Sequence, residues 1–227
     1  MNSAPAAAQA PLADPIAVTP IARVRPLPLH AHSILRHAAK VHRDATVTSV
    51  SPTGSTACLT YAQLAEQAQH YGAELKAHGL GVKSTLINMG VSSVEQLAYL
   101  YAALSVGATT HLMNPLLPPE QVLQLIAAAR PALMLHDDAT AQLVAAVSNL
   151  LPDLSQLKMS AVNVPALHAP TAAPLDDFDE NLPAIVCYSS GTTGLPKAAQ
   201  YTHRSTVLHA WSCALPDAMA LTAQDRV

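Results

Sequence analysis

The sequence predicts an α/β fold, a doubly wound and mostly parallel sheet with flanking helices. Short apolar or β-branched runs alternate with helical stretches along the chain, a pattern typical of such sheets. Apolar residues make up 50% of the 227 positions, whereas charged residues make up 12%, about half of the share usual in soluble domains. This composition excludes a chain that is disordered throughout, and it fits one large domain or two small ones.

Residues 1–29 are predicted to form a disordered leader. Prolines are spread among its alanines, and proline donates to neither a helix nor a sheet. An alternative interpretation as an organelle-targeting peptide rests on Arg23 and Arg25, but Asp14 and the prolines oppose an amphipathic helix there. The stretch also lacks the unbroken apolar core of a secretory signal.

Local signals place the helices. The first helix is predicted over residues 33–41, and it precedes a β-branched strand over 46–50. Thr60 and Gln63 form a capping box before a helix that stops at Gly79.

Three further helices follow. Ser92 and Glu95 are predicted to cap a helix that ends near Gly107. The proline pair 118–119 presets the first turn of a helix through Arg130, because proline already holds a helical φ. The last of the three is expected over residues 140–150.

The remaining strands share short apolar or β-branched sequences, and they are predicted over residues 85–89, 109–113, 132–136 and 184–188. Residues 152–183 are rich in Pro and Asp and are predicted to be an irregular connection.

The loop directly after the last of these strands carries the candidate chemistry. Its small residues let successive backbone N–H groups point into one concavity, its hydroxyls add donors, and Lys197 adds a compact positive charge. The candidate phosphate-binding residues are Ser189, Ser190, Gly191, Thr192, Thr193, Gly194 and Lys197. An exposed turn that binds nothing is the alternative interpretation, and the full nine-residue order with Pro196 before Lys197 argues against it.

Two better-known loops are excluded by single positions. A Walker A loop needs Gly before the lysine and Ser or Thr after it, where this chain has Pro196 and Ala198. A nucleophile elbow needs a leading Gly, where this chain has Cys187 or Tyr188.

Residues 188–197 resemble the signature loop of the adenylate-forming superfamily, which includes acyl-CoA synthetases, luciferases and peptide-synthetase adenylation domains. Residues 59–64 resemble the family's TYxEL helix start, and residues 114–121 resemble its NPxLxxEQ segment. Residues 201–209 are similar to the bacterial branch that activates medium- and long-chain fatty acids. The resemblance covers about residues 30–227.

The resemblance implies a two-step ligation. A fatty-acid carboxylate attacks the α-phosphate of Mg-ATP, giving acyl-adenylate and pyrophosphate, and coenzyme A then takes the acyl group. The loop would wrap the β- and γ-phosphates, with Thr192 and Thr193 as candidates for the residues near Mg²⁺. The implied partners are therefore ATP, fatty acid and coenzyme A.

The sequence departs from the family pattern in two ways. Ala198 stands where the family usually has Gly, and the added methyl matters only if that position needs a positive φ. The chain stops at Val227, before the motifs that the family uses for adenine, ribose, metal and the C-terminal lid. Residues 30–227 are thus expected to be the N-terminal part of an AMP-binding domain, without the lid.

Two functions stay open at this point. One is a fatty-acid–CoA ligase fragment with an incomplete active site, and the other is a non-catalytic nucleotide- or partner-binding remnant. We expect no acyl-CoA formation by the chain alone, and self-association through uncovered apolar faces.

No catalytic or binding role is predicted for the histidines, the acidic run, the tryptophan or the cysteines. The eleven histidines are predicted to be scattered surface or cap residues, the acidic run 176–180 a solvated loop, and Trp211 a core residue. The three cysteines form no CxxC pair, which indicates a reducing cytoplasm and neither a zinc ribbon nor a disulfide framework.

The charge balance and the longest apolar run exclude two further classes of partner. A formal charge of −3 without basic runs argues against nucleic acid. The apolar run 97–108 is too short to span a membrane, which needs ~20 residues.

Overall fold

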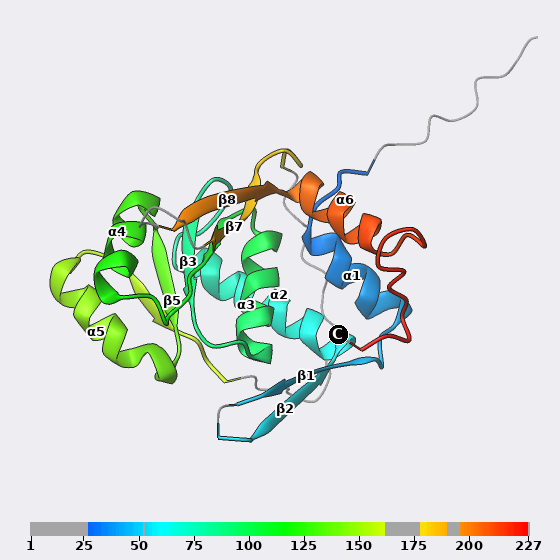
Figure 1. Ribbon diagram of the computed structural model, residues 1–227, viewed down its shortest axis with the longest axis horizontal. Helices are drawn as coiled ribbons and strands as arrows, with labels where there is room; N and C mark the ends of the chain where they lie inside the picture. Colours follow the sequence, from blue (N-terminus) through cyan, green and yellow to red (C-terminus); the bar gives the residue numbers. More distant parts are fainter. Residues whose placement is uncertain (1–26, 52, 162–177, 190–195, 227) are drawn as a thin grey trace, which may run out of the picture.

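The computed structural model describes residues 27–51, 53–161, 178–189 and 196–226 (Figure 1). The helices are α1 (His32–Val41), α2 (Tyr61–Ala77), α3 (Val94–Ser105), α4 (Pro119–Ala129), α5 (Ala141–Leu150) and α6 (His203–Cys213), with a 3₁₀ turn at Asp138–Thr140. The strands are β1 (Thr46–Val50), β2 (Thr56–Thr60), β3 (Thr85–Met89), β4 (Thr109–Leu112), β5 (Leu133–His136), β6 (Gln156–Lys158), β7 (Pro183–Ser189) and β8 (Lys197–Thr202).

Six strands form one sheet in the order β6-β5-β3-β4-β7-β8, and β1 and β2 form a separate hairpin. All neighbours in the large sheet are parallel except β7 and β8, which are antiparallel. The carboxyl ends of the five parallel strands therefore lie along one edge of the sheet. The predicted doubly wound, mostly parallel α/β fold is confirmed.

Helices cover both faces of this sheet, as Figure 1 shows with α4 and α5 on one side and α2 and α3 on the other. Side chains alternate between the two layers, since Leu86 packs with α2 and α3 whereas Ile87 packs with α4 and α5. On the neighbouring strand β5, Leu135 packs with α2 and α3, and Met134 packs with α4 and α5. This two-sided burial explains why the strands read as continuous apolar runs.

The predicted helix signals hold with one correction. Thr60 and Gln63 form the expected capping box, with Gln63 N donating to Thr60 Oγ1 at 3.2 Å and Thr60 N donating to Gln63 Oε1 at 2.9 Å. Helix α3, however, is capped by Ser93 and not by Ser92, because Ser93 Oγ accepts from Gln96 N. Of two adjacent serines, only the one at the correct geometry can cap, and sequence does not distinguish them.

Strands β2, β6 and β8 were not predicted. β6 lies inside the Pro- and Asp-rich stretch expected to be irregular, and it pairs with β5 through only three residues. β8 has the sequence KAAQYT, which has few strand-forming residues, and it forms because β7 offers it a paired edge. Tertiary pairing overrides weak local propensity in both strands.

The prediction of scattered surface histidines is wrong for His30, His32 and His203, which are all buried. His30 stacks on Phe178 with ring centroids 4.1 Å apart, and its Nε2 is 2.7 Å from the Phe178 carbonyl oxygen. His203, the first residue of α6, is fully buried beside them, with its ring 4.9 Å from that of Phe178. We call His30, His32, His203 and Phe178 the histidine cluster.

Two further expectations need correction at this end of the molecule. The acidic run is not simply a solvated loop, because Phe178 is buried and Glu180 accepts from Leu29 N at 2.6 Å and pairs with Arg204. The same contact ties Leu29 to the domain, although a disordered leader was predicted through residue 29. Residues 1–26, 176 and 177 lie outside the described part of the chain.

Trp211 was predicted to be in the core, but 66% of its surface is exposed. Its helix, α6, buries only His203. None of the helices in the described segments has the length and apolar character that crossing a membrane requires.

Candidate functional site

The two ends of the predicted phosphate loop meet at the carboxyl edge of the sheet. Ser189 ends β7 and Lys197 begins β8, and the antiparallel register places them directly opposite each other. Ser189 Oγ lies 3.5 Å from the Lys197 carbonyl oxygen, and both residues are exposed. Ser190, Gly191, Thr192, Thr193 and Gly194, also predicted to bind phosphate, lie outside the described residues.

The local sequence explains how β7 positions Ser189. Ala184 and Val186 are buried, and residues 185–187 pair with residues 110–112 of β4. β8 then reverses the chain direction and brings Lys197 back beside Ser189. In open α/β sheets, ligands bind at the carboxyl ends of the strands, which is where this pair lies.

The Ala198 departure from the family pattern causes no strain. Ala198 lies inside β8 opposite Tyr188. Within the described residues, the non-glycine positions with positive φ are Lys83, Arg130 and Ala220. An extended strand residue accepts a methyl group, so glycine is not required there.

A contact that the sequence did not predict lies next to the loop. Nδ1 of His111, on β4, is 2.6 Å from the hydroxyl oxygen of Tyr188, on β7. Burial lowers the pKa of His111 and raises the pKa of Tyr188, so both side chains are neutral near pH 7. The available signal for His111 was a titratable residue inside a predicted strand, but its partner is 77 positions away.

The other strands that end at this edge are fixed by backbone-capping contacts. Asp137, directly after β5, accepts from Val91 N at 2.7 Å and from Thr140 N at 3.0 Å. Asn114, after β4, accepts from Leu116 N at 2.9 Å. These side chains shape the edge and already have partners within the protein.

No metal centre is evident in the part of the chain that the structure describes, where no group of three or more His, Cys, Asp or Glu side chains could hold an ion. Thr192 and Thr193, predicted to lie near Mg²⁺, are in the undescribed part of the loop. The described portion of the site therefore offers a cation, Lys197, and a hydroxyl, Ser189. Both suit phosphate oxygens.

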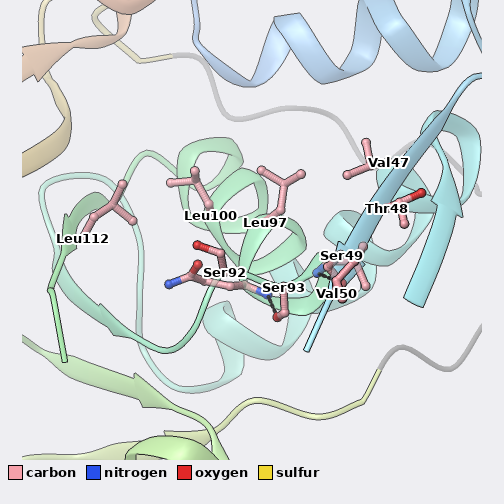
Figure 2. A pocket seen from close by; sticks show the side chains of 11 residues that line it. Val47, Thr48, Ser49, Val50, Ser92, Ser93, Leu97, Leu100 and Leu112 are labelled. Carbon is pink, nitrogen blue, oxygen red and sulfur yellow. Dashed lines mark hydrogen bonds between the residues drawn. The ribbon is translucent and has the colours of Figure 1, made fainter. Parts of the chain in front are cut away.

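A groove of about 440 Å³ lies between β1 and the start of α3, and Leu112 at the end of β4 also lines it. Figure 2 shows Leu97 and Leu100 from α3 on one side, and Val47 and Thr48 from β1 on the other. The hairpin is joined to α3 here, since Val94 N donates to Ser49 Oγ at 3.3 Å. Hydroxyl and apolar groups and the Gln96 amide line the groove, and charged residues do not.

Comparison with known families decides how these features are interpreted. Residues 35–227 match the family described as "AMP-binding enzyme". This chain belongs to the AMP-binding enzyme family.

Relatives of this AMP-binding chain include CoA ligases. It is 31% identical over 215 residues to a 3-methylmercaptopropionyl-CoA ligase of Ruegeria lacuscaerulensis, covering 88% of this chain and 40% of that protein. It is 29% identical over 210 residues to a medium-chain-fatty-acid–CoA ligase of Ectopseudomonas oleovorans, covering 86% of this chain and 38% of that protein. The chain thus spans about 40% of the length of these relatives.

Solved structures confirm the adenylate-forming fold. A long-chain-fatty-acid CoA ligase, described as putative, from Rhodopseudomonas palustris superposes with a TM-score of 0.69 at 19% identity, covering 87% of this chain and 50% of that one. McyG A-PCP, solved with phenylalanyl-adenylate, superposes with a TM-score of 0.71 at 16% identity, covering 89% of this chain and 32% of that one. At these identities the likeness concerns the fold alone.

Proposed function

We propose that this AMP-binding chain binds the phosphates of ATP where Ser189 and Lys197 meet, as part of a ligase that joins a fatty acid to coenzyme A. The observation that carries the proposal is the register of β7 and β8, which places the hydroxyl-bearing and the cationic end of the loop side by side. In this proposal residues 30–227 form the N-terminal part of the AMP-binding domain.

The proposed reaction needs hydrogen-bond donors and a cation beside the phosphates. Attack of a carboxylate on the α-phosphate releases pyrophosphate, on which negative charge accumulates in the transition state. Preorganised donors and a cation stabilise that charge most strongly when they are fixed before the reaction. Lys197 provides the cation, and Ser189 to Thr193 provide hydroxyl and backbone donors. Mg²⁺ would arrive with ATP, near Thr192 and Thr193.

The acyl substrate is proposed from the relatives. One relative is named a medium-chain-fatty-acid–CoA ligase, and another, from Thermus thermophilus, a long-chain-fatty-acid–CoA ligase. A third acts on 3-methylmercaptopropionate by its name, which is also an aliphatic acid. An aliphatic carboxylic acid is therefore the substrate class that we propose.

Isothermal titration of the chain with Mg-ATP and with AMP tests the phosphate site. We expect Lys197→Ala to raise the Kd for ATP about tenfold, equivalent to ~1.4 kcal/mol, and to change the Kd for AMP much less. Lys40→Ala, at an exposed lysine in the last turn of α1, is the matched control and should leave both constants unchanged. Equal ATP affinity in Lys197→Ala and the unmodified chain would contradict the assignment.

Exchange of labelled pyrophosphate into ATP tests the ligase part of the proposal. Aliphatic acids of increasing length are added to the chain together with Mg-ATP. Exchange that depends on one of these acids supports carboxylate activation. ATP binding without exchange for any acid would favour a chain that binds nucleotide and does not react.

A further inference from the structure

We propose that His111 is a positioning residue that acts through Tyr188 to fix the end of β7 from which the phosphate-binding edge is built. The inference rests on the proposed function and adds to it a residue outside the signature loop. Three observations carry it: where the β4–β7 ladder stops, what His111 and Tyr188 contact, and where Ser189 and Lys197 lie relative to them.

The parallel ladder stops before β7 does. Its last register pair is Leu112 with Cys187, where β4 itself ends. Tyr188 and Ser189 extend beyond this pair, and on the other side they are matched with Ala198 and Lys197 of β8. The end of β7 therefore has a backbone ladder to β8 alone, which is an edge strand of the sheet.

The hydrogen bond between His111 and Tyr188 supplies the missing attachment. It joins β4 to this overhang at 2.6 Å, and the Tyr188 ring also packs against the apolar layer beneath α4 and α5. Both partners are half-buried, so water competes for the contact less than at an exposed site. The contact exists in either neutral tautomer of His111: an unprotonated Nδ1 accepts from the Tyr188 hydroxyl, and a protonated Nδ1 donates to the hydroxyl oxygen.

The attachment acts on the site through the next residue in the chain. Ser189 follows Tyr188 directly and faces Lys197 across the hairpin. A shift of about 1 Å in such a group is enough to weaken charge stabilisation substantially. Holding Tyr188 on β4 therefore determines where the Ser189 and Lys197 pair sits at the edge of the sheet.

Four single variants, together with the double variant of Tyr188→Phe and His111→Leu, separate this role from general stability. Tyr188→Phe removes only the hydroxyl, and His111→Leu removes the ring nitrogens. His111→Asn keeps a hydrogen-bonding atom at the position of Nδ1 and is the rescue variant. Ser148→Ala is the matched control, because it breaks a half-buried side-chain hydrogen bond from Gln156, 2.7 Å long, which joins α5 to β6 at the opposite edge of the sheet.

The first measurement is backbone amide hydrogen exchange in the full chain. We expect Tyr188→Phe and His111→Leu to raise exchange about tenfold at residues 188–189 and 197–198. Exchange in β3 and β5 should stay unchanged, and His111→Asn should exchange like the unmodified chain. A uniform increase across the whole sheet, or no local increase in Tyr188→Phe, would overturn the positioning role.

The second measurement is the Kd for Mg-ATP. We expect Tyr188→Phe and His111→Leu each to raise it about fivefold, the double variant to raise it no further, and Ser148→Ala to leave it unchanged. If the unmodified chain binds no ATP, the proposed function fails. Hydrogen exchange then still tests whether His111 holds Tyr188 and the end of β7 in place. Local loosening with an unchanged ATP affinity would refute the link between His111 and the nucleotide. If His111→Leu does not fold, Tyr188→Phe decides both measurements.

Discussion

The backbone N–H of Ala31 donates to Nδ1 of His203 at 3.2 Å, joining the start of the described chain to the first residue of α6. Because Nδ1 accepts, a neutral His203 ring carries its proton on Nε2. Nε2 is buried and has no hydrogen-bond partner among the described residues. Burial, with a smaller effect of His30, lowers the pKa of His203 to about 4. Protonation of this ring therefore destabilises the folded state.

Stability is expected to fall on acidification because of this ring. The unfolded chain takes up the proton near pH 6.5, whereas the folded ring does so only near pH 4, so stability is lost as the pH falls between these values. Between pH 7 and pH 5 the loss should be about 2 kcal/mol for His203. Urea unfolding at both pH values, with His203→Gln as the variant, measures it. The variant should lose about 2 kcal/mol less stability than the unmodified chain, and the exposed His78→Gln should lose as much as the unmodified chain.

Gly107→Ala is expected to destabilise the protein by about 2 kcal/mol or more. Gly107 has a φ of +75°, and an added Cβ would lie 3.0 Å from Val82 and 3.2 Å from the Phe178 ring. Thermal unfolding measures the loss. Gly81→Ala is the control, since an added Cβ there meets nothing within 4 Å. Equal stability of the two variants would mean that the turn after α3 adapts freely.

Tyr99→Phe is expected to lower the free energy of unfolding by about 1–3 kcal/mol. Tyr99 donates to Glu74 Oε2 at 2.7 Å, and its hydroxyl also lies 3.1 Å from Ser160 Oγ. Its ring stacks on Tyr71 with centroids 3.8 Å apart, and this stacking survives the change. Urea unfolding of the variant isolates the hydroxyl. A loss below ~0.5 kcal/mol would show that water replaces these bonds without cost.

Trp211 provides a direct test of the exposed face of α6. As the single tryptophan, 66% exposed, it should emit like tryptophan in water and be quenched readily by acrylamide. Leu208, Leu215 and Met219 are exposed nearby along the chain, so this surface should bind a hydrophobic dye. Trp211→Arg should reduce dye binding and any self-association in size-exclusion chromatography. Val50→Arg, on the exposed hairpin, is the control, and an equal effect of both changes would remove the special role of α6.

The elements that sequence predicted well carry their information locally. Thr60 and Gln63 lie one helical turn apart, so their reciprocal cap is visible in the sequence and is confirmed. Strand 85–89 is mostly apolar because both of its faces are covered, and in strand 184–188 the buried Ala184 and Val186 alternate with half-buried residues. Both runs are visible in the sequence. β6 and β8 depend on partners that sequence does not reveal, and their own residues have weak strand propensity.

The same distinction applies to the site and to the histidine cluster. Ser189 and Lys197 were predicted from a contiguous motif, and the structure places them opposite each other. The role of His111 depends on Tyr188, 77 positions away, and the burial of His203 depends on Ala31, 172 positions away. In the sequence these histidines look like surface residues, because the segments that bury them are far apart along the chain and meet only in the fold.

The long separation between Leu29 or Ala31 and their partners has a consequence for biosynthesis. Leu29 binds Glu180 and Ala31 binds His203, so the first described residues to leave the ribosome are among the last to complete their contacts. At about 5–20 residues added each second, the intervening stretch takes on the order of ten seconds or more to synthesise. During that time Phe178 and His203 have not yet been made, and the apolar surface they will cover stays open to chaperones. Completion of the fold is thereby coupled to arrival of the segment that carries Lys197.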